Sequence, residues 1–589
     1  MRLFPVVLLC ALATTTAYGV DFDRCLKSVQ NGDHGTGRIG ATDNEGNILN
    51  DVQNAIGLTY TLCVQACGGG PEPFDWSTFS REFSAWLLPW LALISQLPFG
   101  PKDRLDNIES VLLTVGSPTL AAYSLALTVL NGRWIARRFS KYTYPNVRNA
   151  VRALSSLQQA PIQVSDRDGL LASLIVLPQN DEWWKELIEW LEYPHTWSVS
   201  AVTSIAWVVI AYAFTVVDSF TGDLSPDWVR NTCGQSVASI WLWLLPVVVG
   251  WLLVSPKCNE ERLRNAMLRA NLLAYVATDS QVLLARRLSK DHHAIDLALV
   301  ELEDDNLRVD ERNTAPVYNF ARFLPWVQSV ETILLCLEAA SARCERHESV
   351  DNDNEWVLTQ PNEKPDMRHR MGNLRQVARY CTMEGLQLHP SRKSRGRWGP
   401  NVRSRIITAS LFALFLQWGT WAAIIIVYFT PTTGLGCRSA SYILFGVLST
   451  LVWMLLLASS LLSHCVTASR PNRACRWLSI ELRRLGKLVA TFNALWIVAT
   501  CFFQFTNFYD NCYCNSAVFG RRHSAFNVIV IVFGDTSRRM WDAWIGGTFL
   551  GSGVAIIFVT FVVLHINPTL PKELESQSQT EDICVCRCN

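Results

Sequence analysis

The sequence predicts an all-α integral membrane protein, built as a multi-span helical bundle with a small extracytoplasmic N-terminal domain and a helical cytoplasmic insert. Hydrophobic residues make up 49% of the 589 positions and charged residues only 17%. The apolar residues are gathered into long runs and are not spaced at the period of a surface helix or strand. Several runs reach the roughly 20 residues that a helix needs to cross about 30 Å of hydrocarbon. The formal net charge of +1 gives no indication of a nucleic-acid partner.

Residues 1–19 have the pattern of a secretory signal peptide. Arg2 precedes an apolar stretch, and the small residues Ala17 and Gly19 stand just before a possible cleavage point. An uncleaved anchor is the alternative, and it would leave the next residues on the same side of the membrane. Residues 20–82 are polar and contain cysteines, so they predict a small domain in an oxidising, extracytoplasmic compartment.

Seven apolar stretches without acidic residues, lysine or arginine predict the transmembrane helices. Aromatic residues such as Trp197, Tyr428 and Tyr442 lie in or at the ends of these runs, as in the aromatic belts of membrane proteins. The expected spans are 111–130, 197–217, 236–255, 406–430, 441–463, 488–506 and 545–565.

The arginine-rich connections predict the orientation of these spans. Residues 131–152, 391–405 and 464–487 are strongly basic, whereas 218–235 is acidic and 431–440 holds only Arg438. Short basic loops stay in the cytoplasm. Seven crossings put all three basic loops there. The larger predicted cytoplasmic regions are the 131–196 segment, the 256–405 domain and the 566–589 tail.

A further apolar stretch, "FSAWLLPWLALISQLPF" over 83–99, is expected to enter the membrane without crossing it. An outer N-terminus and an inner 131–152 loop require an odd number of crossings between them, and 111–130 already supplies one. Pro89 and Pro98 interrupt helical hydrogen bonding, so a re-entrant or interfacial helix is predicted. The alternative is a true first span, which gives eight crossings.

The last outer loop, 507–544, is at odds with this topology because it carries Arg521, Arg522, Arg538 and Arg539. It also contains "AFNVIVIVF" over 525–533, which is too short to span as a helix. A second membrane-dipping segment is one explanation, and a wrong orientation of the final third is another.

The predicted cytoplasmic regions contain amphipathic helices. In "DEWWKELIEWLEYPHTW" the apolar residues share one helical face opposite mainly acidic residues, which favours packing on the protein's own inner domain. Residues 258–289 and 316–346 are expected to be helices. The aromatic cluster "TAPVYNFARFLPW" is interpreted as core and not as a ligand site. The acidic stretches "ELEDD" and "DNDNE" are interpreted as solvated loops.

Two groups of cysteines follow from the topology. Those on the predicted outer side are possible disulfide partners, namely Cys25, Cys63, Cys67, Cys233, Cys437, Cys512 and Cys514. Cys584, Cys586 and Cys588 end the predicted cytosolic tail, where S-acylation is a hypothesis. Metal chelation fits less well because alternating thiols match no standard zinc spacing, and a tail with free thiols is the simplest alternative.

No catalytic motif, cofactor site or metal site is recognisable, so a non-enzymatic protein is expected. "KDHHAID" lacks the cysteine of the Asp-His-His-Cys acyltransferases because Ala294 stands in its place. The glycines 68–70 lack the lysine of a P-loop, and no metalloprotease or serine-hydrolase motif occurs. The predicted spans contain no ionisable residue before His565, which lowers the expectation of ion-coupled transport.

The stretches "CGGGPEPFDWSTFSREFSAWLLPWLALISQLPFG" and "SVLLTVGSPTLAAYSLALTVLNGRW" resemble a family of polytopic integral membrane proteins of filamentous fungi. "SIWLWLLPVVVGWLLVSPKC" and "APVYNFARFLPW" look like further family stretches. The resemblance implies a fungal endomembrane or cell-surface protein, and it implies no activity and no site residue.

We therefore expect a non-enzymatic protein that senses or organises at the plasma membrane or at a vacuolar or other endomembrane. Its partners would be the lipid bilayer and a cytoplasmic protein bound through 256–405. A channel or uncoupled facilitator with a pore lined by Ser, Thr, Gln and Asn is the alternative.

Overall fold

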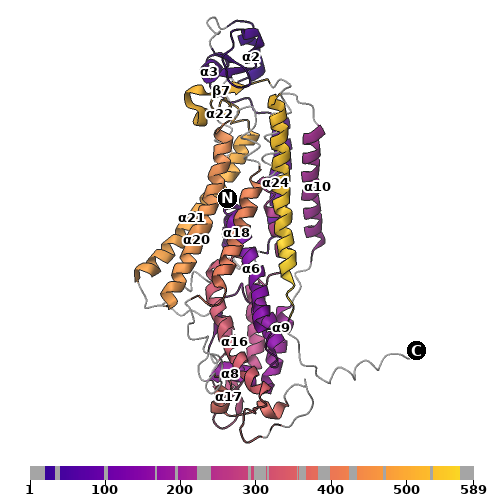
Figure 1. Ribbon diagram of the computed structural model, residues 1–589, viewed down its shortest axis with the longest axis vertical. Helices are drawn as coiled ribbons and strands as arrows, with labels where there is room; N and C mark the ends of the chain where they lie inside the picture. Colours follow the sequence, from indigo (N-terminus) through magenta and orange to yellow (C-terminus); the bar gives the residue numbers. More distant parts are fainter. Residues whose placement is uncertain are drawn as a thin grey trace, which may run out of the picture.

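Long apolar helices build the body of the molecule (Figure 1). They are α4 (Trp76–Ile94), α5 (Arg104–Gly116), α6 (Pro118–Phe139), α10 (Val199–Thr221), α12 (Leu244–Val254), α18 (Val402–Thr420), α20 (Cys437–Ala468), α21 (Arg473–Phe505) and α24 (Asp535–Ile566). The computed structural model describes residues 20–33, 40–98, 104–165, 169–192, 197–221, 240–288, 293–297, 314, 317–354, 356, 366–382, 398–422, 434–468, 473–530 and 535–570.

Among the described residues, five helices are long and apolar enough to cross a membrane, or six if the bent pair α5–α6 forms one span. Four of the five, α10, α20, α21 and α24, coincide with predicted spans. Large apolar side chains point outward from them, for example Phe214 (70% exposed), Leu488 (68%) and Phe549 (76%). Such exposed apolar faces are normal against lipid and unfavourable in water. The chain is therefore a helical membrane protein.

Two other predicted spans are described only in part. Helix α18 covers the start of 406–430, and α12 covers the end of 236–255. Residues 423–430 and 236–239 lie outside the described residues. The expected uninterrupted helix over 111–130 is wrong. The chain breaks between α5 and α6, whose axes differ by 103°. Pro89, by contrast, is accommodated inside α4 without ending it.

One end of the molecule, called here the disulfide end, contains the N-terminal domain together with the connection between α21 and α24 (Figure 1). Strands β1 (Ala41–Thr42), β2 (Gly57–Thr59) and β7 (Phe526–Val528) form one antiparallel sheet in the order β1-β2-β7. The other elements there are α2 (Phe22–Gln30), η1 (Val52–Asn54), α3 (Tyr60–Cys67), α22 (Cys512–Asn515), α23 (Val518–Arg521) and η7 (Arg522–Ser524).

Strand β7 counts against a membrane-dipping segment over 525–533, which was one of two explanations for the 507–544 loop. Its alternating apolar residues pair with β2, register Leu58 against Asn527, and are buried at the disulfide end. Residues 531–533 of that stretch lie outside the described residues. A short run of β-branched and aromatic residues suits a strand. A local sequence pattern does not reveal that its sheet partner, β2, lies far earlier in the chain, with Leu58 opposite Asn527.

The opposite end, called here the helical end, is a domain of shorter helices around α16 (Phe323–Glu345) (Figure 1). Its elements are α7 (Val147–Ser156), β3 (Ile162–Val164), α8 (Leu170–Val176), η3 (Pro178–Asn180), α9 (Asp181–Leu191), α13 (Glu260–Leu272), β4 (Tyr275–Ala277), β5 (Val282–Leu284), α14 (Ala285–Leu288), β6 (Ile295–Leu297), η4 (Asn319–Ala321), η5 (Met367–Arg370) and α17 (Leu374–Tyr380). Although α16 has the length and composition of a span, it packs on α8, β3 and α17, and 61% of its most apolar window is buried.

The sequence-based expectations for this end are partly confirmed. The apolar face of α9, including Trp183, Trp184 and Leu187, is buried in the protein as predicted. The aromatic cluster before α16 is core, with Tyr318 and Trp326 almost fully buried. The single helix expected over 258–289 is wrong, because after α13 the chain forms the β4–β5 hairpin. The Thr278 hydroxyl accepts from the Gln281 amide and fixes that turn.

Candidate functional site: a polar junction at the break between α5 and α6

The break is produced by three consecutive residues, Gly116, Ser117 and Pro118. Pro118 occupies the first turn of α6, where its missing N–H costs nothing, and it cannot continue α5. The Ser117 side chain caps α6 by accepting from the Leu120 amide at 3.3 Å. Gly116 allows α5 to approach the backbone of α21, because a Cβ there would lie 2.0 Å from the Ala490 carbonyl oxygen.

Polar side chains from four helices surround this break, and we call them the polar junction. All are at most 1% exposed. They are Ser117 and Thr119 of α6, Gln417 of α18, Ser449 of α20 and Asn493 of α21. Irregular backbone inside an apolar bundle must find hydrogen-bond partners within the protein, and the junction supplies them.

Gln417 is the centre of one half of the junction. Its Oε1 accepts from the Thr119 amide at 3.2 Å and from the hydroxyls of Thr119 and Ser449. Its Nε2 donates to the Gly446 carbonyl at 2.9 Å and to the Thr450 hydroxyl at 3.1 Å. One side-chain amide thus joins α6, α18 and α20.

Asn493 forms the other half. Its Nδ2 donates to the carbonyl of Gly116 at 2.8 Å and to that of Phe445 at 3.0 Å, so it joins α5, α20 and α21. Its Oδ1 is buried without a hydrogen-bond partner among the described residues. A buried acceptor of this kind is able to accept a hydrogen bond from a water molecule or a small polar solute.

The chemistry available at the junction is limited to hydrogen bonding. Its hydroxyls and amides are neutral donors and acceptors, with no carboxylate, imidazole or amine among them. They can hold helices together or contact a polar solute. They supply no general acid or base for a reaction.

A second buried cluster joins the bundle to the helical end, and we call it the coupling node. Arg405 at the start of α18 is 5% exposed and donates to the Asn131 Oδ1 of α6 at 2.5 Å. Its guanidinium lies 4.0 Å from the Trp134 ring centroid and 5.1 Å from that of Phe323 at the start of α16. A planar cation between two aromatic rings is held by cation–π attraction as well as by its hydrogen bond.

The segment before α16 makes further contacts with α5, α6 and α20. The Tyr318 hydroxyl bonds to that of Thr114, and the Asn319 Nδ2 donates to the Thr128 hydroxyl at 2.8 Å. Ser460 donates to the Phe320 carbonyl at 2.6 Å. The helical end is therefore bonded to the bundle at several buried points.

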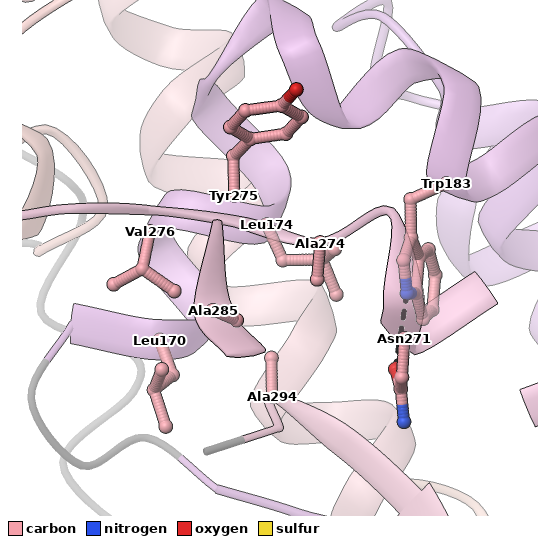
Figure 2. Close-up of a pocket in the computed structure, with 9 residues that line it drawn as sticks. All are labelled: Leu170, Leu174, Trp183, Asn271, Ala274, Tyr275, Val276, Ala285 and Ala294. Atoms are coloured by element: carbon pink, nitrogen blue, oxygen red, sulfur yellow. Dashed lines mark hydrogen bonds between the residues drawn. The ribbon is translucent and has the colours of Figure 1, made fainter. Parts of the chain in front are cut away.

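A small cavity lies within the helical end (Figure 2). It lies between α8, α9, α13 and the β4–β5 hairpin, and Trp183 Nε1 donates to Asn271 Oδ1 across its edge at 3.1 Å. Its volume of about 10 Å³ leaves room for about one water molecule. It is too small to bind an organic ligand in this conformation.

The structure pairs six of the seven predicted outer cysteines. The disulfides are Cys25–Cys67, Cys63–Cys512 and Cys437–Cys514, and all lie at the disulfide end. Three predictions fall on residues outside the described ones: Cys233 as a disulfide partner, the acylation candidates Cys584, Cys586 and Cys588, and the predicted signal peptide over 1–19.

Sequence reasoning did not identify the polar junction. In the sequence, Gln417 and Asn493 are single polar residues inside apolar runs, and such residues more often hold helices together than bind a substrate. The available signal was the Gly-Ser-Pro triplet at 116–118 in the middle of an apolar run, because such interruptions point to discontinuous helices.

Comparisons of the chain with family models, with curated proteins and with solved structures found no match. The resemblance to a fungal membrane-protein family therefore stays a prediction.

Proposed function

We propose that this chain is a non-enzymatic membrane protein that couples a disulfide-bonded outer domain to a helical domain in the cytoplasm, and so acts as a sensor or an organiser. The observation that carries the proposal is a series of contacts between the two ends: a disulfide, buried hydrogen bonds and a cation–π contact, joined by packed helices. A protein that only anchored an outer domain would not need buried bonds to a large domain on the other side.

The orientation is supported by the cysteines. The N-terminal domain, the start of α20 and the connection after α21 share three disulfides, which form in oxidising compartments. These disulfides support a topology with this end outside and with the helical end, which includes the basic 131–152 segment, inside. The arginines of 507–544 that disagreed with the topology are explained in part by local contacts, since Arg521 lies 4.1 Å from the Phe526 ring centroid.

The path begins at Cys63–Cys512, which ties α3 to the connection after α21 across 449 residues of sequence. The closely packed pair α20–α21 leads to Ser449 and Asn493 at the polar junction. From there α6 runs to the coupling node, where Arg405 contacts Phe323 of α16. A displacement at the outer domain would thus reach the inner domain through packed, hydrogen-bonded elements.

Hydrogen exchange of the full chain in nanodiscs tests this coupling. The double variant Cys63→Ser/Cys512→Ser removes the tether, and Cys25→Ser/Cys67→Ser removes a disulfide that lies wholly within the outer domain. We expect faster amide exchange in α16 and in residues 131–139 of α6 for the first variant only. Equal protection of α16 in both variants would refute the coupling.

A second candidate function is an uncoupled facilitator, favoured by one observation: the helix break and its polar side chains lie deep in the bundle. Discontinuous helices surround the substrate sites of many transporters. Proteoliposomes loaded with a small neutral solute test it. Solute efflux that Asn493→Leu abolishes would favour the facilitator and count against the sensor, whereas sealed vesicles would count against the facilitator.

A further inference from the structure

Helix α3 carries two cysteines one turn apart, and each belongs to a different disulfide. Cys63 is bonded to Cys512 of α22, and Cys67 is bonded to Cys25 of α2. The Sγ atoms of Cys63, Cys67 and Cys512 all lie within 4.8 Å of one another. A sulfur of one disulfide is therefore close enough to attack the other after only a side-chain rotation.

The four cysteines differ in access to solvent. Cys25, Cys63 and Cys512 are 6%, 0% and 1% exposed, whereas Cys67 is half-buried at the end of α3. An external thiol therefore reaches the Cys67 sulfur before the others.

We propose that Cys67 is a thiol–disulfide exchange site whose partner is a dithiol reductant, either an oxidoreductase or a small dithiol. A thiolate of the reductant attacks Cys67 Sγ, the bond between Cys67 and Cys25 breaks, and the Cys25 thiolate takes up a proton. The second thiol of the reductant, as thiolate, then attacks the mixed disulfide. This releases the Cys67 thiolate and oxidises the reductant to its own disulfide.

The Cys67 thiolate next attacks Cys512 Sγ. A Cys67–Cys512 bond forms, the bond between Cys63 and Cys512 breaks, and the Cys63 thiolate takes up a proton. In total, one protein disulfide is reduced, one dithiol is oxidised, and one protein disulfide changes partner. Cys512 is the expected target because its Sγ lies 3.4 Å from the carbonyl oxygen of Gly68, the residue after Cys67.

The exchange moves the outer tether by one turn of α3, about 6 Å along the helix axis. Cys512 would still be bonded to α3 of the N-terminal domain, but at the last turn of that helix instead of at its middle. Because β2 follows directly into α3 and pairs with β7, this shift would alter how the N-terminal domain sits on the connection after α21. The chemistry does not depend on the sensor function proposed above.

The variant Cys25→Ser tests the second step without any reductant, because it leaves Cys67 as a free thiol. The full chain is held in detergent at pH 8, quenched with acid, alkylated differentially before and after reduction, and mapped by mass spectrometry. The exchange replaces one disulfide by another of similar kind, so both forms should be present at equilibrium. We expect about half of the molecules to contain Cys67–Cys512 and free Cys63, and the rest to keep Cys63–Cys512. A Cys63–Cys512 bond that stays intact throughout would overturn the proposal.

The matched control is Cys437→Ser, which frees Cys514, a residue outside the three-sulfur cluster in the described part of the chain. It should leave Cys63–Cys512 unchanged. Equal rearrangement in both variants would mean indiscriminate scrambling and would also overturn the proposal. Native protein given less than one equivalent of dithiothreitol provides a test free of substitutions. It should yield Cys67–Cys512 with free Cys25 and Cys63, and a Cys63–Cys67 product would contradict the assigned exchange.

Discussion

Replacing Gly116 by alanine should destabilise the protein because two backbones meet at this residue. A Cβ at position 116 would lie 2.0 Å from the Ala490 carbonyl oxygen, whereas real Cβ atoms essentially never come closer than 3.0 Å. Helix α5 must therefore retreat from α21 by about 1 Å or more. Overpacking of this kind costs about 1–3 kcal/mol. The retreat also weakens the hydrogen bond from Asn493 to the Gly116 carbonyl, which contributes about 1 kcal/mol.

The free energy of unfolding should thus fall by about 2–4 kcal/mol. For a chain of 589 residues this lowers the melting temperature by about 2–3 °C. Thermal unfolding in detergent, followed by size-exclusion chromatography, measures this. The matched control is Gly132→Ala in α6, where nothing lies within 4 Å of the added Cβ. Because alanine has a higher helix propensity than glycine, this variant should be as stable as the native protein or slightly more stable. If Gly116→Ala has the same melting temperature as the native protein, α5 and α21 do not approach each other as closely at the break as described.

Two further predictions concern the helical end. Arg405→Ala should make the helical end more sensitive to limited proteolysis, and Arg405→Lys should not restore resistance, because an ammonium lacks the planar surface that lies 4.0 Å from the Trp134 ring centroid. If Arg405→Lys resists proteolysis as well as the native protein does, positive charge alone is sufficient to stabilise the coupling node. Burial raises the pKa of Cys258 to about 12, from a model-compound value of 9.0. Its thiolate is therefore scarce at pH 8, and iodoacetamide should modify it only after denaturation. Above pH 9 the unfolded thiol ionises while the folded one does not, so this residue's contribution to stability should fall as pH rises toward 12.

Composition and run length were sufficient to predict the helical bundle. The length and apolar character that let a helix span a membrane are properties of its own local sequence. The same holds for α9, whose tryptophans repeat at helical spacing and are buried. Local patterns failed where a partner distant in sequence decides the structure. Residues 526–528 became a strand because β2 pairs with them, and the helix break at Ser117 persists because Gln417 and Asn493 satisfy its backbone.

The topology requires an odd number of crossings between the N-terminal domain and residues 131–152. That number stays odd if a segment other than 83–99 is the re-entrant one. Phe79, near the start of α4, packs on Phe505 at the end of α21 that leads to the disulfide end. Glu109 of α5 pairs with Lys487 of α21 at 2.7 Å. Lys487 and Phe505 are 18 positions apart on one helix, which is about 27 Å. Between residues 79 and 109 the chain therefore descends nearly the depth of a hydrocarbon core. Helix α5 then rises from Glu109 to the polar junction, and α6 descends to Arg138.

These contacts favour α4 as a crossing helix and α5–α6 as the re-entrant element, the reverse of the sequence-based assignment of 83–99 and 111–130. The N-terminal domain and residues 131–152 stay on opposite sides in either case. The accessibility of introduced cysteines distinguishes α4 as the crossing helix from 111–130 as the crossing helix. A cysteine at Ser95, just after α4, should react with a membrane-impermeant maleimide only after permeabilisation, and one at Glu72 should react in intact cells. Labelling of the Ser95 position in intact cells would place the end of α4 outside and restore 111–130, broken as it is, as the first crossing.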